Sequence, residues 1–255
     1  MPSTYRMVLA YDGSRYHGWQ AQPQVKTVQG ELSLALAALT SERPLITAAG
    51  RTDAGAHAHG QVVAFGLSSE WAPQALASGC NALLPEDIGV LTTDLVAADF
   101  HPRFGAWRRS YRYLIRDRAS ADPVGRQYEW RLPQVLELAP MRAAARLYLG
   151  RQDFRSFGSS PAPGGSTLRT VDRAELEQRG ASIQLEIRAD AFLKGMMRNL
   201  VGALVAVGSG RADVADVRRA LANPQVGKLP WIMAPAHGLH QWRVDYRVPA
   251  GEEAA

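Results

Sequence analysis

The chain has 255 residues, of which 29 are lysine or arginine and 24 are aspartate or glutamate, giving a net charge of +5. Its one cysteine, Cys80, excludes an internal disulfide and any metal site built from several cysteines. The longest apolar run, residues 200–208, is too short to span a bilayer, and the first residues lack the pattern of a signal peptide. We therefore expect a soluble, cytoplasmic protein with no membrane partner.

Arginine dominates the basic residues. Only three of the 29 are lysine (Lys26, Lys194 and Lys228), which leaves 26 arginines. Arginine forms forked hydrogen bonds with phosphate and stacks on bases, so this usage favours a nucleic-acid partner. A compositional bias toward arginine and alanine explains the same numbers, and the net charge does not decide between the two.

The N-terminal part is predicted to alternate strands and helices. The segment TYRMVLAYDG alternates apolar and polar residues and ends in an Asp12-Gly13 turn, which indicates a strand. Thr27 is a suitable N-cap for a helix over 28–40. The other elements predicted here are strands over 44–49, 60–67 and 88–96 and a helix over 71–81.

The C-terminal part has a similar order. Alternating residues over 106–117 predict a strand, and Arg179-Gly180 is the expected turn of a hairpin over 168–190. The other elements predicted here are helices over 134–149, 193–207 and 211–222 and a strand over 240–246.

These elements predict an α+β fold of two lobes, residues 1–105 and 106–248, followed by a flexible tail, 249–255. Each lobe would have a mainly antiparallel sheet covered on one side by helices. The other sheet face would be free, and such a face can bind RNA in RRM-like or ferredoxin-like modules.

Common cofactor and hydrolase motifs are absent from the sequence, including GxGxxG, GxxxxGK[ST], HExxH, CxxC and GxSxG. His57 and His59 could in principle share a metal ion. No cysteine or histidine stands near them at ligand spacing, so polar or capping roles are favoured. We expect neither a metal nor a cofactor.

The segment AAGRTDAGAHAHGQVVAF, residues 48–65, places Arg51 and Asp53 between two glycines and directly before an apolar strand. Gly50 and Gly55 allow positive φ angles or the close approach of another backbone, so the loop can be tight. Such a loop could present the Asp53 carboxylate for chemistry, with Arg51 near enough to favour its ionised form. An Asx turn, in which Asp53 bonds its own backbone, explains these residues equally well.

This loop closely resembles GRTDAGVHA, the signature of the tRNA pseudouridine synthase A family. Further blocks similar to the family's follow in the same order from about residue 5 to 247: YDGSRYHGWQAQP, VQGELSLAL, DFHPRFGAWRRSYRYLI, DFRSFGSS, FLKGMMRNLVGALVAVG and GLHQWRVDY. The resemblance implies a cofactor-free enzyme that flips out and isomerises uridines in the anticodon stem-loop of tRNA. It also implies a homodimer whose lobes meet around a central sheet, with the active-site cleft between them.

Residue by residue, the resemblance assigns four roles. Asp53 matches the catalytic aspartate, Arg198 the arginine that pairs with it, and Tyr111 the tyrosine that contacts the uracil. Arg51 matches the arginine that displaces and holds out the flipped nucleotide. From periodicity alone, Tyr111 is a packed core residue and Arg198 a solvated surface residue.

Two departures from the family pattern, Ala56 for valine and Pro102 for a small residue, remove no functional group. In the block that contains Pro102, His101 and Arg103 are predicted to bind tRNA through its phosphates. The same role is considered for Arg108 and Arg109, although salt-bridged or merely exposed side chains explain all four nearly as well.

Two other functions remain open. A non-catalytic RNA-binding module would leave tRNA unmodified, and the intact GRTDAG loop argues against it. A glycosidic hydrolase would release free uracil, but it normally uses two carboxylates, and no second one stands near Asp53 in the sequence. Whether Asp53 attacks C1′, attacks the pyrimidine ring or removes a ribose proton is also open.

Overall fold

The structure is a computed structural model that describes residues 2–118, 123–160, 164–180, 182–224 and 229–247. Its contacts divide the chain into two compact units. Unit 1 runs to Trp107 and resumes at His240, and unit 2 is Arg108–Leu239. The prediction grouped residues 106–248 together, whereas the last strand clusters with unit 1. The predicted tail, 249–255, lies outside the described residues.

Unit 1 is a sheet with two helices. Its strands lie in the order β4-β1-β3-β10, and the short β2 also pairs with β3. The pairs within β4, β1, β3 and β2 are antiparallel, whereas β10 runs parallel to β3. The elements are β1 (Ser3–Tyr11), α1 (Val28–Thr40), β2 (Thr47–Ala48), β3 (His57–Leu67), α2 (Pro73–Leu83), β4 (Ile88–Val96) and β10 (Leu239–Tyr246).

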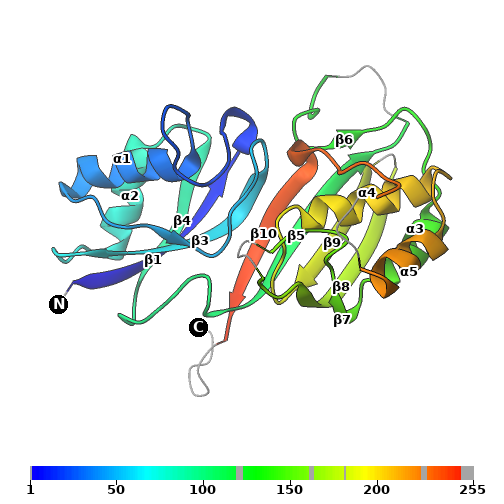
Figure 1. Ribbon diagram of the computed structural model, residues 1–255. Helices are drawn as coiled ribbons and strands as arrows, with labels where there is room; N and C mark the ends of the chain where they lie inside the picture. Colours follow the sequence, from blue (N-terminus) through cyan, green and yellow to red (C-terminus); the bar gives the residue numbers. More distant parts are fainter. Residues whose placement is uncertain (1, 119–122, 161–163, 181, 225–228, 248–255) are drawn as a thin grey trace. The chain divides into compact units, whose positions relative to one another are not determined.

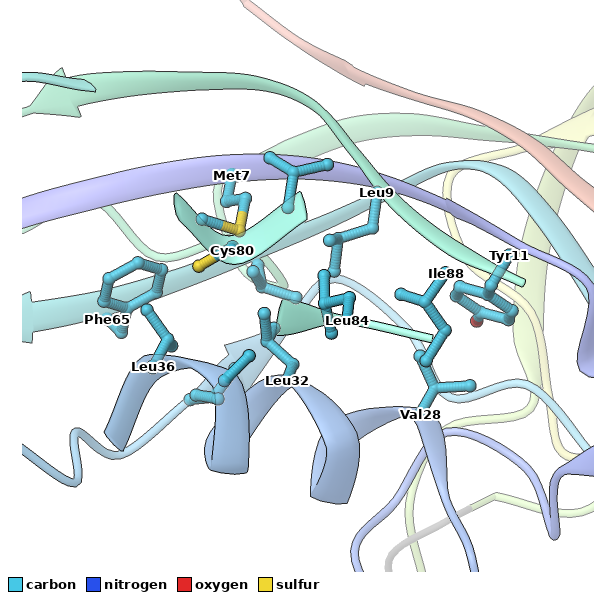
Figure 2. Close-up of a cluster of buried hydrophobic side chains, with 14 of the residues drawn as sticks. Met7, Leu9, Tyr11, Val28, Leu32, Leu36, Phe65, Cys80, Leu84 and Ile88 are labelled. Atoms are coloured by element: carbon cyan, nitrogen blue, oxygen red, sulfur yellow. The ribbon is translucent and has the colours of Figure 1, made fainter. Parts of the chain in front are cut away.

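The core of unit 1 forms because alternate residues of β1 point to the helix-covered face. Tyr5, Met7, Leu9 and Tyr11 are buried, and the residues between them are half-buried. Figure 1 shows α1 and α2 over this face, and Figure 2 shows the apolar side chains that they contribute to it. The helix predicted over 28–40 is confirmed, because the Thr27 hydroxyl accepts a hydrogen bond from the Gly30 N–H at 3.2 Å.

Unit 2 contains the remaining strands of the sheet and the three helices α3, α4 and α5, which lie on one face of these strands (Figure 1). Its strands lie in the order β5-β9-β8-β7, all in antiparallel pairs, with the short β6 beside β5. The elements are β5 (Ala106–Arg116), β6 (Trp130–Arg131), α3 (Leu138–Arg146), β7 (Gly150–Asp153), β8 (Leu168–Arg179), β9 (Ser182–Ala189), α4 (Met196–Gly208) and α5 (Val214–Ala222).

Several predicted elements are shorter than expected, and two of them differ most. The helix expected over 134–149 begins only at Leu138. Pro140 has no N–H and its ring would clash with a helical carbonyl four residues earlier, so the helix must begin within a turn of it. The strand expected over 44–49 is reduced to β2, which pairs with β3 at two positions.

The prediction of an α+β fold with mainly antiparallel sheets is confirmed. The predicted hairpin over 168–190 is present as β8 and β9, and Gly180 has a φ of 60° at its turn. Among the described residues, no helix has the length and apolar character that crossing a membrane requires.

Candidate active site

The loop between β2 and β3 carries Arg51 and Asp53. The Val62 carbonyl accepts from the Ala49 N–H at 2.8 Å, and the Gln61 side-chain amide donates to the Gly50 carbonyl at 2.8 Å. The loop is therefore anchored where it leaves β2.

A tight turn closes the other end of this loop. The Ala56 N–H donates to the Asp53 carbonyl at 3.1 Å, and Gly55 has a φ of 79°. The predicted use of a left-handed glycine is thus confirmed at Gly55. Gly50 contributes its carbonyl to the bond from the Gln61 side chain.

The segment of residues 12–19, in which the sequence predicts only a turn at Asp12-Gly13, packs directly on this loop. The Trp19 N–H donates to the Thr52 carbonyl at 3.1 Å, and the Gly55 N–H donates to the Tyr16 carbonyl at 3.3 Å. A Cβ added at Gly18 would lie 2.7 Å from the Thr52 carbonyl oxygen, and one at Gly13 would lie 1.9 Å from that of Ala56. These two positions accept only glycine at this spacing.

The glycines at 13 and 18 were the available signal for this packing. They stand in YDGSRYHGW, where local patterns predict a role for Gly13 in a turn and none for Gly18. Asp12 does act as the predicted turn residue, because its carboxylate accepts from the Ser14 N–H at 2.9 Å. The missed contribution is the contact with a loop some forty residues further along the chain.

Burial separates the three central residues of the loop. Thr52 is only 7% exposed, whereas Arg51 is exposed and Asp53 is half-buried. The guanidinium and the carboxylate therefore stand on either side of a residue that points into unit 1.

The two histidines after the loop take part in ring stacking. His57 is buried, accepts from the Gly13 N–H at 3.1 Å through Nδ1, and stacks on His240 with the ring centroids 4.7 Å apart. His59 contacts the same ring, with its Nε2 3.2 Å from Nδ1 of His240. Within the described parts of the chain, no group of three or more His, Cys, Asp or Glu could hold a metal ion.

The other predicted tRNA-binding residues of unit 1 form a compact turn before β5. The ring nitrogen Nδ1 of His101 accepts from the N–H groups of Arg103 at 3.1 Å and Phe104 at 3.2 Å. The Tyr246 hydroxyl donates to the Pro102 carbonyl at 2.7 Å. This turn exposes Arg103 and leaves the Phe104 side chain 77% exposed. His101 therefore shapes the turn that presents them.

Unit 2 contains Tyr111 and Arg198. Tyr111 lies on β5, is 8% exposed, and meets the Phe192 ring edge-on with the centroids 4.7 Å apart. The Tyr113 hydroxyl, two residues further on, donates to the Pro235 carbonyl at 2.7 Å. Burial raises the pKa of Tyr113, and the positive charge of Arg198 acts in the opposite direction. Arg198 therefore lies close enough to Tyr113 to act on it electrostatically.

Arg198 is in the first turn of α4, where the positive end of the helix dipole disfavours a cation by about 0.3–1 kcal/mol. Its Nε donates to the Ala234 carbonyl at 2.6 Å, and its own carbonyl accepts from the Ala234 N–H at 3.1 Å. The side chain is half-buried. The arginine is thus fixed at a position that a helix alone would disfavour, and it is not a freely solvated surface residue.

The free face of the unit 2 sheet is a network of paired charges. Arg108 and Arg188 both bond the Asp172 carboxylate, and Arg112 bonds Glu186 at 2.8 Å. Arg109 is 8% exposed and donates to the Asp190 carbonyl at 2.7 Å. For Arg108, the salt-bridged role is the one observed, and Arg109 is held inside unit 2.

Comparison with known proteins gives the family. The model of the tRNA pseudouridine synthase family matches residues 7–105 and 144–247. The chain belongs to this family. The matched residues include Asp53 and Arg198, whereas Tyr111 lies between the two matched segments.

Relatives named tRNA pseudouridine synthase A align along nearly the whole chain. That of Pseudothermotoga lettingae is 39% identical over 95% of this chain and 99% of its own length. Those of Methylobacterium nodulans and Neisseria meningitidis are 40% and 41% identical over 95% of this chain, and over 95% and 91% of their own lengths.

The solved structures that align include an archaeal box H/ACA sRNP Nop10–Cbf5 complex, at 10% identity over 79% of this chain and 43% of that chain. Its TM-score of 0.35 is too low to relate the two folds. As a member of the tRNA pseudouridine synthase family, the chain is an isomerase that forms pseudouridine in tRNA.

Proposed function

We propose that this pseudouridine synthase modifies uridines in the anticodon stem-loop of tRNA and that Asp53 is its catalytic carboxylate. The observation that supports Asp53 most directly is its placement. It follows a buried, doubly hydrogen-bonded threonine in a loop anchored at both ends, yet its own side chain is half-buried rather than enclosed. A carboxylate held by backbone geometry meets the need for a positioned nucleophile or base.

The reaction leaves the elemental composition of the nucleotide unchanged. The N1–C1′ bond breaks, the uracil turns, and a C5–C1′ bond forms, while C5 loses a proton and N1 gains one. No oxidant and no phosphoryl donor is consumed. A carboxylate is suited to the first step, because it is ionised at neutral pH and can leave again once the new bond forms.

Arg51 is the proposed wedge for the flipped nucleotide. A base that reacts at N1 and C5 must leave its stack, at a cost of a few kcal/mol. The guanidinium of Arg51 is exposed two residues before Asp53, so it can occupy the space that the base leaves and bond the RNA.

Arg198 and Tyr111 are proposed to complete the site in unit 2. Arg198 would pair with the Asp53 carboxylate and keep it ionised and oriented during the reaction. The Tyr111 ring would pack against the uracil. The hydrogen bond from the Arg198 side chain to the Ala234 carbonyl supports this role. It orients the arginine at the N-terminus of α4, where a cation does not stabilise the helix.

In the turn before β5, Arg103 is proposed to bind a phosphate, with His101 holding the turn that presents it. We propose further that the two units are RRM-like lobes around a central sheet and an active-site cleft, in a cytoplasmic homodimer. Unit 1 supports the lobe assignment, because its order β-α-β-β-α-β with strands β4-β1-β3-β2 is that of ferredoxin-like modules.

The test is Asp53→Asn in the purified protein. We expect pseudouridine formation to fall by at least about 10⁴-fold, the upper end of what one positioned acid–base group supplies. Affinity for unmodified tRNA should change little, because one carboxamide replaces one carboxylate. Mapping pseudouridines by a chemical stop assay gives the positions modified by the wild type. Activity retained by Asp53→Asn would overturn the catalytic role, stops outside the anticodon stem-loop would overturn the proposed site, and release of free uracil would indicate a hydrolase.

A further inference from the structure

Thr52 lies between the two proposed functional residues of the loop. Hydrogen bonds hold both its side chain and its backbone. Its hydroxyl is 2.8 Å from the hydroxyl of Tyr11, and its carbonyl accepts from the Trp19 N–H at 3.1 Å. A buried residue with two such contacts cannot rotate without breaking one of them. The directions in which the Arg51 and Asp53 side chains point from the loop therefore depend on the position of Thr52.

The pairing of β1 with β3 is irregular where Tyr11 contacts Thr52. Leu9 pairs with Gln61, but Tyr11 pairs with Ala58, so the bulge lies in β3, which contributes one extra residue opposite the end of β1. Bulges of this kind redirect a side chain and are common beside active sites. The Tyr11 ring is 4% exposed and stacks on Trp19 with the centroids 6.1 Å apart. Figure 2 shows it at one end of the unit 1 core.

The backbone that meets Thr52 is itself fixed to α1. The first N–H groups of a helix have no partner within the helix. Here the Val28 N–H donates to the Gly18 carbonyl at 3.2 Å, and the Gln29 N–H donates to the Trp19 carbonyl at 3.0 Å. Trp19 thus joins the start of α1 to the loop, through its carbonyl on one side and its N–H on the other.

We propose that the Tyr11–Thr52 hydroxyl pair is a positioning contact for catalysis, which fixes the carboxylate of Asp53 against the target nucleotide. The proposal rests on the catalytic role of Asp53. Tyr11 and Thr52 do not touch the reacting atoms. They act by setting the loop, so their loss should slow the reaction of bound tRNA without weakening its binding.

The experiment removes each hydroxyl with the least change in shape, in Tyr11→Phe and Thr52→Val. A displacement of about 1 Å at a catalytic group can cost about 10²-fold in rate, and we expect a fall of roughly 10- to 100-fold in the single-turnover rate. The rate is measured as tritium release from tRNA carrying 5-tritiated uridine, since the C5 hydrogen is expelled. The Kd for unmodified tRNA, from filter binding, should stay within about twofold of the wild-type value.

The chain offers a matched control in Tyr5→Phe. Tyr5 lies on the same face of β1, is fully buried, and donates from its hydroxyl to the Trp71 carbonyl at 3.0 Å. It stacks on Phe65, at the opposite end of the core from Tyr11 in Figure 2. The Tyr5 hydroxyl also accepts from the Trp71 N–H at 2.8 Å, so Tyr5→Phe should lower thermal stability at least as much as Tyr11→Phe does and leave the rate unchanged. Thr52→Ser keeps the hydroxyl and should restore most of the rate that Thr52→Val loses.

The double variant Tyr11→Phe, Thr52→Val should be no slower than the slower single variant, because both substitutions break one contact. Wild-type rates in both single variants, equal rate losses in Tyr5→Phe and Tyr11→Phe, or fully additive losses would overturn the positioning role. Asp53→Asn is assayed alongside. If that variant is active, the proposed function fails; if it is inactive while Tyr11→Phe and Thr52→Val turn over normally, only the positioning role fails.

Discussion

Asp53 in unit 1 and Arg198 in unit 2 are held in opposite ways. The loop of Asp53 is fixed through its backbone, by hydrogen bonds from Trp19, Gln61 and a neighbouring turn. Arg198 is fixed through its own side chain, by the bond from Nε to the Ala234 carbonyl. Side chains far from the chemistry should therefore affect the first site strongly, whereas the second should depend mainly on the arginine itself.

The substitution with the largest expected effect is Gly13→Ala, which tests whether backbone packing holds the loop of Asp53. A Cβ at this position would lie 1.9 Å from the Ala56 carbonyl oxygen, which is backbone and cannot turn aside. We expect a loss of about 2 kcal/mol or more in the free energy of unfolding, as for other overpacked sites, and nearly complete loss of activity. Urea unfolding followed by fluorescence measures the first and tritium release the second.

Gly66→Ala is the matched control for that substitution. A Cβ at Gly66 in β3 would meet nothing closer than the Ser3 carbonyl oxygen at 4.0 Å. Its stability should be equal to or slightly above that of the wild type, with normal activity. If both alanine variants behave alike, the packing of Gly13 on the loop is not what holds the site.

A second change, Arg198→Gln, tests the side-chain-held site. Removing one preorganised charge typically costs about 10²-fold in rate, and we expect a loss of that size. The variant loses a charged hydrogen bond worth about 1.5–3 kcal/mol and relieves a dipole penalty of about 0.3–1 kcal/mol, so the free energy of unfolding should fall by about 0.5–2.7 kcal/mol. Arg142→Gln serves as control, because Nε of Arg142 also donates to a carbonyl, that of Leu176, at 3.4 Å. A rate loss shared by both variants would contradict a specific role for Arg198.

The smallest expected effect is on tRNA affinity, and it is tested by substituting two arginines that have different surroundings. Arg103 is exposed on its turn, whereas Arg112 bonds Glu186, which also contacts Arg173 at 3.4 Å. Arg103→Gln should weaken tRNA binding a few-fold and lower the salt dependence of the affinity by about one phosphate contact. Arg112→Gln should change neither quantity. Equal effects in both variants would mean that the charged face of the unit 2 sheet also binds tRNA.

Predictions from the sequence succeeded where the deciding residues are neighbours along the chain. The helix over 28–40 follows from its Thr27 cap, and the strand over 88–96 has the observed bounds. The helix over 134–149 was overextended because the apolar pattern outweighed Pro140. The strands β6 and β7 were missed because segments of two and four residues have no measurable alternation.

For the candidate site, the family and the residues that carry functional groups can be predicted from contiguous sequence motifs. A contiguous motif, GRTDAG, contains Arg51 and Asp53, and its left-handed glycine at position 55 is a local property. The contacts that hold Arg51 and Asp53 in place are seen only in the folded protein. Two sets of contacts join parts of the chain about forty residues apart. They are the hydrogen bonds of Thr52 with Tyr11 and Trp19, and the close contacts made by the glycines of the 12–19 segment. Local patterns carry no information on such contacts, because they form only when the sheet and α1 bring the two segments together.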